Sequence, residues 1–411
     1  MSNSEMDILN GLPAQPDPSL GLDEVATGST WRRLLRRVDW GAYGIVIGTI
    51  VLWFIFDIAT NGLFLSPRNL TLLMVQGVVL GIVASGAVLV MVMGHIDLSV
   101  GSTVGFTATI AGWLQAIQGW STPPTLLVVA LVGIAIGAWQ GAWIAYAGIP
   151  AFIVTLAGMS LFRGLSYVMS NGQTFAPMSS SFETISNGSL LPSLSLILIL
   201  AAIVLFITYL VRTAEVSTTG WHGRFNALAT SLVKGTPLLA ILVGIGFVST
   251  AYRGIPYAVL IMAAVALALA FVSQRTRFGR HLYAIGGNRE AAVLSGINVA
   301  RHTFVAFVGM GFLYAMGGMV LASRLDGAVP DAALGLELDV ITACILGGTS
   351  LFGGIGTVQG AILGALLLTT LNNGMDLIGF STFAQWVVKG TVLLVAVLLD
   401  VWLKKRQVAA A

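Results

Sequence analysis

Long apolar stretches separated by short polar segments fill the chain from residue 41 onward. About 20 consecutive apolar residues cross a bilayer as an α-helix, so stretches that meet or approach this length are typical of membrane spans. Short stretches can also be re-entrant half-spans that are buried in protein. The apolar windows are 41–60, 70–93, 98–118, 125–147, 150–170, 191–211, 236–251, 256–273, 302–323, 338–354, 356–373 and 386–403, of which 236–251, 338–354 and 356–373 are short.

Composition narrows the class of protein. Of the 411 residues, 56% are apolar and only 9% are charged, and the mean hydropathy is +0.91. Soluble domains carry about 25% charged residues. The chain is therefore predicted to be an all-α polytopic membrane protein with about 10–12 transmembrane helices, some of them half-spans. The net charge of +3 comes from lysines and arginines that border the spans, so it describes membrane orientation and implies no nucleic-acid partner.

The ends of the chain differ from its apolar body. Residues 1–40 are polar, contain three prolines and lack the apolar core of a cleavable signal peptide. We interpret them as a cytoplasmic tail ending in a short helix, Trp31 to Trp40, that anchors on membrane lipid; a plain orientation signal is the alternative. The transmembrane domain is predicted to cover 41–403, and residues 404–411 form a second cytoplasmic tail.

The distribution of lysine and arginine along the chain supports a cytoplasmic first tail, because these residues gather in cytoplasmic loops. If the first tail is inside and the spans alternate, four segments are cytoplasmic and hold 15 of the 20 lysines and arginines. Both termini are then cytoplasmic. The four segments are 32–37, 212–235, 274–301 and 404–406.

The polar and basic island within 274–301 separates two apolar windows. In it, Asn288 can cap a short helix that runs to about Gly296, and Glu290 complements the helix dipole. Ala291, Ala292 and Leu294 offer a small apolar surface. Such a helix indicates docking to a soluble partner, although a basic loop lying on anionic headgroups is the alternative.

Two glycine-dense segments, Gly94 to Gly105 and Leu346 to Gly360, interrupt apolar runs in opposite halves of the chain. Glycines permit close packing of helices, but paired interruptions in two halves also mark broken helices that line a transport path. Both interpretations remain open from the sequence.

The first of these segments contains ionisable residues at membrane depth, which by default indicate function. Asp97 precedes an apolar helix and is expected to cap it by accepting from an N–H near Ser99 or Val100. Lining of a permeation path and proton relay are the other roles considered for Asp97. His95 is either a pH-sensitive group or a histidine with satisfied hydrogen bonds.

Several motifs are missing from the sequence. It contains no G-x-x-x-x-G-K-[ST] phosphate loop, and no H-E-x-x-H or G-x-S-x-G motif. With four scattered histidines and the single cysteine Cys344, no metal site, nucleophile or intrachain disulfide is expected. The chain is therefore not expected to be an enzyme or to bind a cofactor.

Five stretches carry a resemblance to a known family: GHIDLSVGS, IPAFIVTLAGMSLFRG, FGRHLYAIGGNREAAVLSGIN, LDVITACILGGTSLFGGIGTVQGA and LNNGMDLIGFSTFAQWVVKG. Together they resemble the permease subunit of bacterial ABC-type monosaccharide importers, the ribose/galactose/xylose group, and the xylose type most closely. The resemblance covers nearly everything from residue 41 to 405. It implies an inner-membrane subunit that pairs with a second copy of itself, binds a cytoplasmic ATPase that holds the ATP, and receives sugar from a periplasmic binding protein.

Within the resemblance, Glu290, Ala291, Ala292 and Gly296 match the E-A-A-x-x-x-G pattern of the family's coupling helix, which seats on the ATPase. With Asn288 as its cap, this helix is the predicted coupling site. His95 departs from the family pattern, which has a small or acidic residue at this position.

The function expected from the resemblance is translocation of a monosaccharide, xylose or a related pentose. Polar residues within or beside the apolar windows can hydrogen-bond sugar hydroxyls or bond between helices. Asp326, Asp331 and Glu337 are predicted to touch the binding protein. The alternatives are a proton-coupled transporter with a relay through Asp57, His95 and Asp97, and a non-transport membrane scaffold. The candidate path residues are Gln76, Asp97, Ser99, Asn372 and Asn373.

Overall fold

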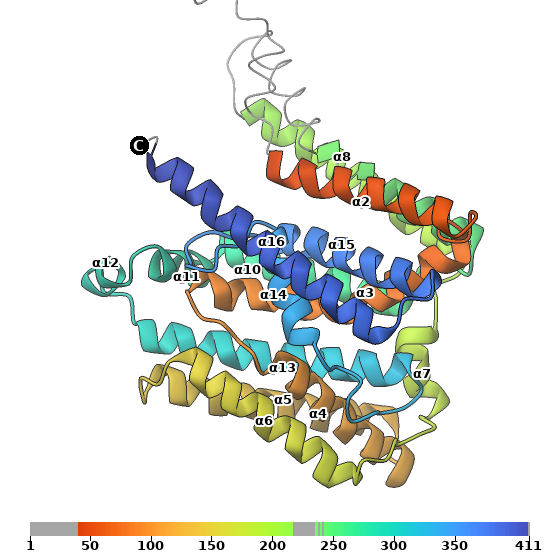
Figure 1. Cartoon of the computed structure of the whole chain (residues 1–411), viewed down its shortest axis with the longest axis horizontal. Coiled ribbons are helices and arrows are strands. Elements are labelled where there is room, and N and C mark those ends of the chain that lie inside the picture. The colour runs from red at the N-terminus through yellow and green to blue at the C-terminus, as the bar shows by residue number, and fades with distance from the viewer. Residues whose placement is uncertain (1–39, 217–234, 237–238, 241, 410–411) are drawn as a thin grey trace, which may run out of the picture. The chain divides into compact units, whose positions relative to one another are not determined.

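A computed structural model describes residues 40–216, 235–236, 239–240 and 242–409 (Figure 1). The predicted tail and interfacial helix before residue 40, and most of the predicted loop 212–235, lie outside these residues. The chain divides into two compact units, Met1–Asp39 with Phe206–Thr236, and Trp40–Leu205 with Pro237–Ala411. Everything below concerns the second, larger unit.

The prediction of an all-α protein is confirmed. Within the described ranges the backbone forms helices and two isolated β-bridges, Phe175 with Ala328 and Ser189 with Pro256, and no strand. A helix lies in every predicted apolar window, including Leu242–Ala251 in the window 236–251. The named helices are α2 (Trp40–Ala59), α3 (Pro67–Val92), α4 (Val100–Gly112), α5 (Thr122–Ala145), α6 (Ala151–Ser170), α7 (Ser180–Asn187), α8 (Pro192–Val216), α10 (Tyr257–Arg275), α11 (Arg277–Gly287), α12 (Arg289–Leu294), α13 (Val299–Arg324), α14 (Leu336–Leu346), α15 (Val358–Leu377) and α16 (Thr382–Ala409), and a π-helical turn, Trp113–Ile117, continues α4.

Six of the described helices are long and apolar enough to cross a membrane: α3, α5, α6, α10, α13 and the Pro192–Arg212 part of α8. Of the three short windows, 338–354 holds a helix that is too short to cross a bilayer. α14 has 11 residues, which is a length of about 16 Å against a hydrocarbon core of about 30 Å. The window 356–373, by contrast, is a full-length helix, since α15 has 20 residues. The protein is therefore a multi-pass membrane protein with some incomplete crossings.

Local sequence signals set the starts of the two longest central helices. At α3 the hydroxyl of Ser66 accepts from the Asn69 N–H, and Pro67 occupies the first turn, where no N–H partner is needed. At α13 the side chain of Asn298 accepts from the Arg301 N–H at 2.9 Å. Each helix then runs for 26 residues, and α3 is buried without interruption from Val78 to Val92.

α13 lies between α5 and α4 on one side and α3 on the other (Figure 1). Its contact with α5 depends on glycines, because a Cβ on Gly133 or Gly137 would collide with the α13 backbone, and one on Gly311 would collide with α5. Without a hydrophobic driving force between helices in lipid, such close backbone contact lets dispersion forces hold them together.

α3 and α13 have matching surroundings. Each is followed by a non-helical segment, 93–99 or 325–335, and then by a short helix, α4 or α14. Each short helix packs on the long helix of the other pair: α4, which follows α3, packs on α13, and α14, which follows α13, packs on α3. This arrangement is typical of transporters built from two related halves. The structural counterpart of the segment 93–99 is therefore 325–335, and not the second glycine-dense segment with which the sequence pattern paired it.

The first turns of α4 and α14 meet. A Cβ on Gly101, in the first turn of α4, would collide with the carboxylate of Glu337, in the first turn of α14. Glu337 is consequently 9% exposed, so it is not part of a surface for a binding protein, and this part of the prediction is wrong. Of its two companions, Asp331 is exposed, and Asp326 accepts from the Met178 N–H at 2.9 Å.

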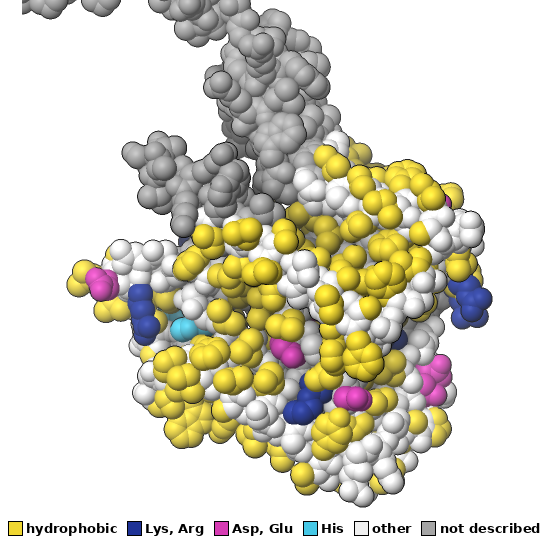
Figure 2. Space-filling model, viewed as in Figure 1, with side chains coloured by type: hydrophobic (Ala, Val, Ile, Leu, Met, Phe, Trp, Pro, Cys, Tyr) yellow, Lys and Arg dark blue, Asp and Glu magenta, His cyan; other side chains and the backbone are white. Residues whose placement is uncertain are grey.

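Hydrophobic side chains cover much of the visible face of the described residues, and charged side chains are few there (Figure 2). A group of charged side chains lies over α12, which protrudes at one end of the molecule. The surface thus matches a membrane-embedded body with a polar attachment at α12.

Candidate translocation path and coupling helix

The predicted helix in the basic island is confirmed as α12, and its cap is the predicted one. The side chain of Asn288 accepts from the Ala291 N–H at 2.9 Å, and Glu290 lies in the first turn. At the other end Gly296 has φ of +80°, and the N–H groups of Gly296 and Ile297 donate to the carbonyls of Val293 and Ala292 at 2.9 and 3.0 Å. This is a Schellman ending, which explains why glycine suits position 296.

The exposed face of α12 differs in part from the predicted one. Ala292 points inward and is 4% exposed, whereas Ala291 is exposed as expected. The apolar tip is formed by Val293 and Leu294, which are 55% and 88% exposed. The sequence prediction did not include Val293, because only its position on the helix, and no sequence motif, marks it as exposed. Two large aliphatic side chains held out by a helix capped at both ends form a compact apolar contact surface.

We call the end of the bundle that carries α12 the α12 end. α3 and α5 end there, and α6 and α13 begin there, because residues from all four positions line one pocket together with Arg289 of α12. A second pocket marks the opposite end, where α3 begins and α13 ends, and is lined in part by Arg68, Arg253 and Arg324.

Asp97 and Ser99 belong to a buried hydrogen-bond network, here called the Asp97 network. Asp97 Oδ1 accepts from the backbone N–H and from the hydroxyl of Ser99, at 2.8 and 2.7 Å, and Oδ2 accepts from the Tyr314 hydroxyl. Gln140 Nε2 donates to Ser99 Oγ at 2.7 Å. All four residues are at most 5% exposed, so the network joins α5 and α13 to the segment that leads into α4.

The prediction that Asp97 caps α4 is right about the hydrogen bond that Asp97 accepts and wrong about the position of Asp97 relative to the helix. The expected N–H of Ser99 does donate to the carboxylate, but Ser99 itself is the N-cap residue of α4 and no side chain caps the helix. Asp97 instead lies two residues before the N-cap and closes a local turn. Tyr314 was missed, because it lies 217 residues away in sequence and only the packing of α13 brings it close.

Gln76 and Asn373 lie in a different place, between α3 and α15. Asn373 exchanges hydrogen bonds with Asn69, at 2.9 and 3.1 Å, and donates to Gln76 Oε1 at 3.1 Å. Buried amides that satisfy one another in this way hold helices together. The structure therefore separates two of the predicted path residues from the Asp97 network and favours a packing role for them.

Asn372 lies near a third polar group, in which Lys389 of α16 forms an ion pair with Asp339 of α14 at 2.9 Å. This is the only ion pair among the described residues. Buried charges in a membrane protein are expected to pair in this way. The pair ties the short helix α14 to α16, and no local sequence signal joins these two positions, which are 50 residues apart.

The proposed proton relay residues do not come together. Asp57 accepts from the Leu65 N–H at 3.0 Å in the turn before α3, whereas His95 follows the end of α3. A 26-residue helix separates these two ends by about 39 Å. Asp97 is turned into its buried network, and His95 lines the pocket at the α12 end.

The end of α3, the second glycine-dense segment and the basic island meet at the α12 end, through contacts that we call the glycine junction. The Gly354 N–H donates to the Val92 carbonyl at 2.8 Å, and a Cβ on Gly286 would collide with that same carbonyl. The hydroxyl of Tyr283 in α11 donates to the Gly356 carbonyl at 2.8 Å. The backbone just before α12 is thus packed directly onto the end of α3 and onto the loop between α14 and α15.

Comparisons with known proteins agree with this architecture. Residues 69–397 match a family described as "Branched-chain amino acid transport system / permease component". The chain is 39% identical to the xylose transport system permease protein XylH of Escherichia coli (strain K12), over 90% of this chain and 94% of that protein. It is 38% identical to XylH of Haemophilus influenzae, over 90% and 99%, and 35% identical to the ribose import permease protein RbsC of Escherichia coli (strain K12), over 82% and 87%.

No solved structure matches the chain significantly. The relatives are named as permease proteins, which agrees with the expectation of a transport subunit that is not an enzyme. A family match over most of the chain and identities well above 30% over most of both partners confirm the resemblance seen in the sequence. The protein belongs to the family of transport-system permease components, in the group that contains the xylose and ribose permease proteins.

Proposed function

We propose that the protein is the membrane-spanning permease subunit of an ATP-driven importer and translocates a monosaccharide, xylose or a related pentose, across the inner membrane. The names of its relatives supply the substrate class, with the xylose permease proteins at 38–39% identity and the ribose permease protein at 35%. ATP is bound and hydrolysed by a separate partner, because the sequence has no phosphate loop.

The observation that carries this proposal is α12. It is a short helix outside all candidate spans, capped by Asn288 and ended by Gly296, with Val293 and Leu294 exposed at its tip. Such a helix buries its apolar tip in a groove of a soluble partner. In the proposed complex the partner is the cytoplasmic ATPase, so the α12 end is cytoplasmic and the opposite end faces the periplasmic sugar-binding protein. Both termini then lie in the cytoplasm.

Coupling is mechanical. When the ATPase domains close on ATP, they displace α12 and, through Gly286 and Tyr283, the glycine junction. Two interruptions of the membrane helices share this junction, so one displacement reaches both halves of the bundle. The two end states are favoured by different partners, as in other switches between packed arrangements. The second copy expected in the complex is implied by the family resemblance.

In this proposal Asp97 and Ser99 are the predicted path residues that retain this role. Their network joins α5, α13 and the start of α4, and the Gln140 carbonyl oxygen in it is buried without a partner among the described residues. A buried, partnerless acceptor is costly, and a sugar hydroxyl entering during transport would satisfy it. Gln76, Asn372 and Asn373 have helix-packing roles.

The experiment that tests the proposal is uptake of radiolabelled xylose, with ribose in parallel, into proteoliposomes that contain this chain, the ATPase and the binding protein, each component being omitted in turn. Uptake that requires all three proteins and ATP is expected. Uptake by this chain alone that an uncoupler abolishes would establish the proton-coupled alternative instead. Absence of flux in every combination, with ATPase binding retained, would favour the scaffold.

A separate test addresses α12. Leu294→Asp places a charge on the most exposed apolar side chain of the helix tip and is expected to abolish co-purification of the ATPase. The control is Ala284→Asp, at an exposed position of α11. Equal ATPase recovery with both variants would contradict the docking role of α12.

A further inference from the structure

The pocket at the α12 end has a volume of about 440 Å³, within the range of about 300–1,000 Å³ that is usual for small-molecule sites. It lies where the segment after α3, the connection between α5 and α6, and the start of α13 meet. One residue, Ile96, separates His95 in this pocket from Asp97 in the buried network. The pocket therefore lies close to that network along the chain, on its α12 side.

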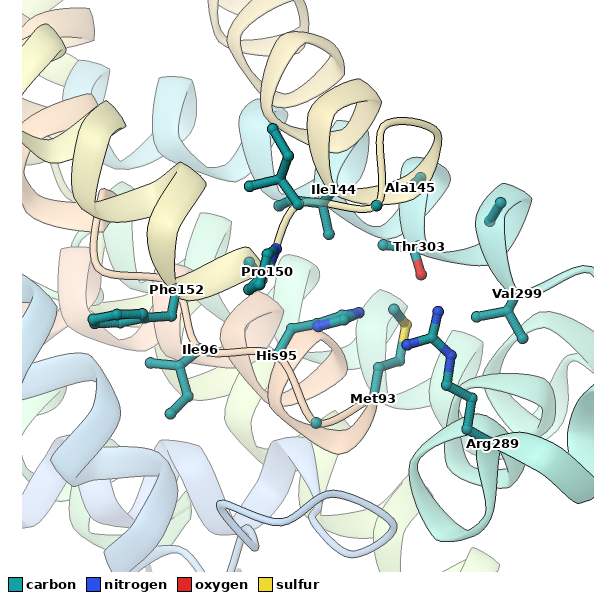
Figure 3. Close-up of a pocket in the computed structure, with 15 residues that line it drawn as sticks. Met93, His95, Ile96, Ile144, Ala145, Pro150, Phe152, Arg289, Val299 and Thr303 are labelled. Carbon is teal, nitrogen blue, oxygen red and sulfur yellow. The ribbon is translucent and has the colours of Figure 1, made fainter.

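Three polar groups face the pocket from three different elements. Figure 3 shows the His95 imidazole, the Arg289 guanidinium and the Thr303 hydroxyl turned toward the same space, with Pro150 beside it. In the part of the chain that the structure describes, none of these three side chains has a hydrogen-bond partner. Their donors and acceptors are available to a ligand.

The chemistry of this set suits a neutral polyol better than an anion. Burial, and secondarily the charge of Arg289, lowers the pKa of His95 to about 4, so the imidazole is neutral near pH 7 and presents one donor and one acceptor. The Arg289 guanidinium adds hydrogen-bond donors, and the Thr303 hydroxyl adds a donor and an acceptor. Pro150 and Ile144 supply the apolar surface on which the C–H face of a sugar ring packs.

One wall of the pocket belongs to α12. Arg289 is the first residue of this helix, whereas the other lining residues belong to the membrane bundle. A displacement of α12 therefore moves one of the three polar groups away from the other two. Occupancy of the pocket and the position of α12 are linked by this single side chain, and linkage acts in both directions.

We propose that this pocket is the cytoplasm-facing monosaccharide site of the permease, from which the sugar leaves, and that Arg289 makes its affinity depend on the position of the coupling helix. The proposal rests on the proposed function. His95, Arg289 and Thr303 hydrogen-bond the sugar hydroxyls. When α12 moves with the ATPase, the guanidinium contact is lost and the sugar is released.

Cysteine labelling tests the site directly, because the single native cysteine, Cys344, is fully buried. Thr303→Cys places a thiol in the pocket, and Ala147→Cys places one on the exposed connection between α5 and α6, outside the lining residues. Both are labelled with a membrane-impermeant maleimide in inside-out vesicles that carry the full complex without nucleotide. Ala300→Cys, also in the lining, replaces Thr303→Cys if that variant does not fold.

The expected result is that xylose or ribose slows labelling at position 303 by roughly tenfold when the sugar is at ten times its dissociation constant, with no effect at position 147. Labelling at position 303 that neither sugar slows, or that inorganic phosphate slows and sugar does not, would overturn the site. In either of these cases, ATP-dependent uptake by the native complex would leave the proposed function standing.

The role of Arg289 in sugar binding is tested separately, by measuring how sugar protects the thiol of the Thr303→Cys variant from labelling. Arg289→Ala is expected to raise the sugar concentration needed for half-protection by on the order of tenfold or more, since a hydrogen bond to a charged group is lost. Arg280→Ala, in the same basic island but outside the pocket, is the control. Equal half-protection in the two variants would remove Arg289 from the site.

Discussion

The two glycine-dense segments of this chain look alike in sequence and differ in structure. In the first, residues 94–99 are non-helical and bring Asp97 and Ser99 into a buried network, and Val100 to Gly105 already belong to α4. Leu346 to Gly360 forms tight turns with positive φ at Gly348, Gly353 and Gly354. The first segment uses glycine to interrupt a helix and place polar side chains, and the second uses it to bring backbones together.

The largest effect is expected at the glycine junction, where the second segment meets the end of α3 and the basic island. Gly286→Ala puts a methyl group into the Val92 carbonyl, and because that atom is backbone the strain cannot be relieved by a rotamer change. We expect destabilisation by about 3 kcal/mol or more, in the range of severe overpacking, together with loss of uptake. Thermal unfolding in detergent and uptake by the complex measure the two effects.

The neighbouring Gly287 is the matched control for this change, because a Cβ there meets nothing within 4 Å. Gly287→Ala is expected to leave stability unchanged or to raise it by up to about 1 kcal/mol through helix propensity. If the two alanine variants have the same melting temperature, the glycine junction is not the rigid contact that we describe.

A smaller effect is expected in the network of the first segment. Tyr314→Phe removes the donor to Asp97 Oδ2 and leaves a buried carboxylate oxygen without that partner. The expected cost is about 1–3 kcal/mol, with slower uptake. A double-mutant cycle with Asp97→Asn isolates the interaction, and additive effects of the two substitutions would show that the two side chains are not coupled.

An effect of similar size depends on pH. The folded pKa of His95, about 4, is below the unfolded value near 6.5, so the unfolded chain binds the proton first as pH falls. Stability is therefore nearly unaffected above pH 6.5 and declines between pH 6.5 and 4, by about 2 kcal/mol at pH 5. His95→Gln should remove this decline when melting temperatures at pH 7 and pH 5 are compared. An unchanged decline in the variant would assign it to other groups.

The smallest effect is expected in the second segment. The Thr349 hydroxyl is buried without a hydrogen-bond partner among the described residues, so Thr349→Val removes no bond. Stability should stay within about 0.5 kcal/mol of the native value or rise slightly. A loss as large as that of Tyr314→Phe would show that the second segment also depends on a polar contact.

The sequence predicted those parts of the site that depend on neighbours in the chain. Asn288 and Gly296 are recognisable as a cap and a helix end because each acts within four residues, and both have the expected roles. The hydrogen bond from the Ser99 N–H to Asp97 was predictable for the same reason.

The sequence did not predict how the polar residues would be grouped. Gln76 and Asn373 are polar, like Asp97 and Ser99, and only packing showed that Asn373 bonds to Gln76 and Asn69 instead. Tyr314 reaches the Asp97 network, and Asp339 pairs with Lys389 in a separate polar group, from distant parts of the chain without a local pattern to mark them.

By itself, the sequence determined that this protein is a bundle of membrane helices with a capped helix on a basic loop, because hydrophobic length, capping and charge sidedness act over short distances along the chain. Only the tertiary structure decided which polar groups meet, that the second glycine-dense segment meets the end of α3 and the basic island, and that Arg289 reaches the pocket beside His95. These contacts join residues far apart in sequence, and in a uniformly apolar environment hydrophobicity does not specify which helix faces which; close backbone packing and hydrogen bonds do.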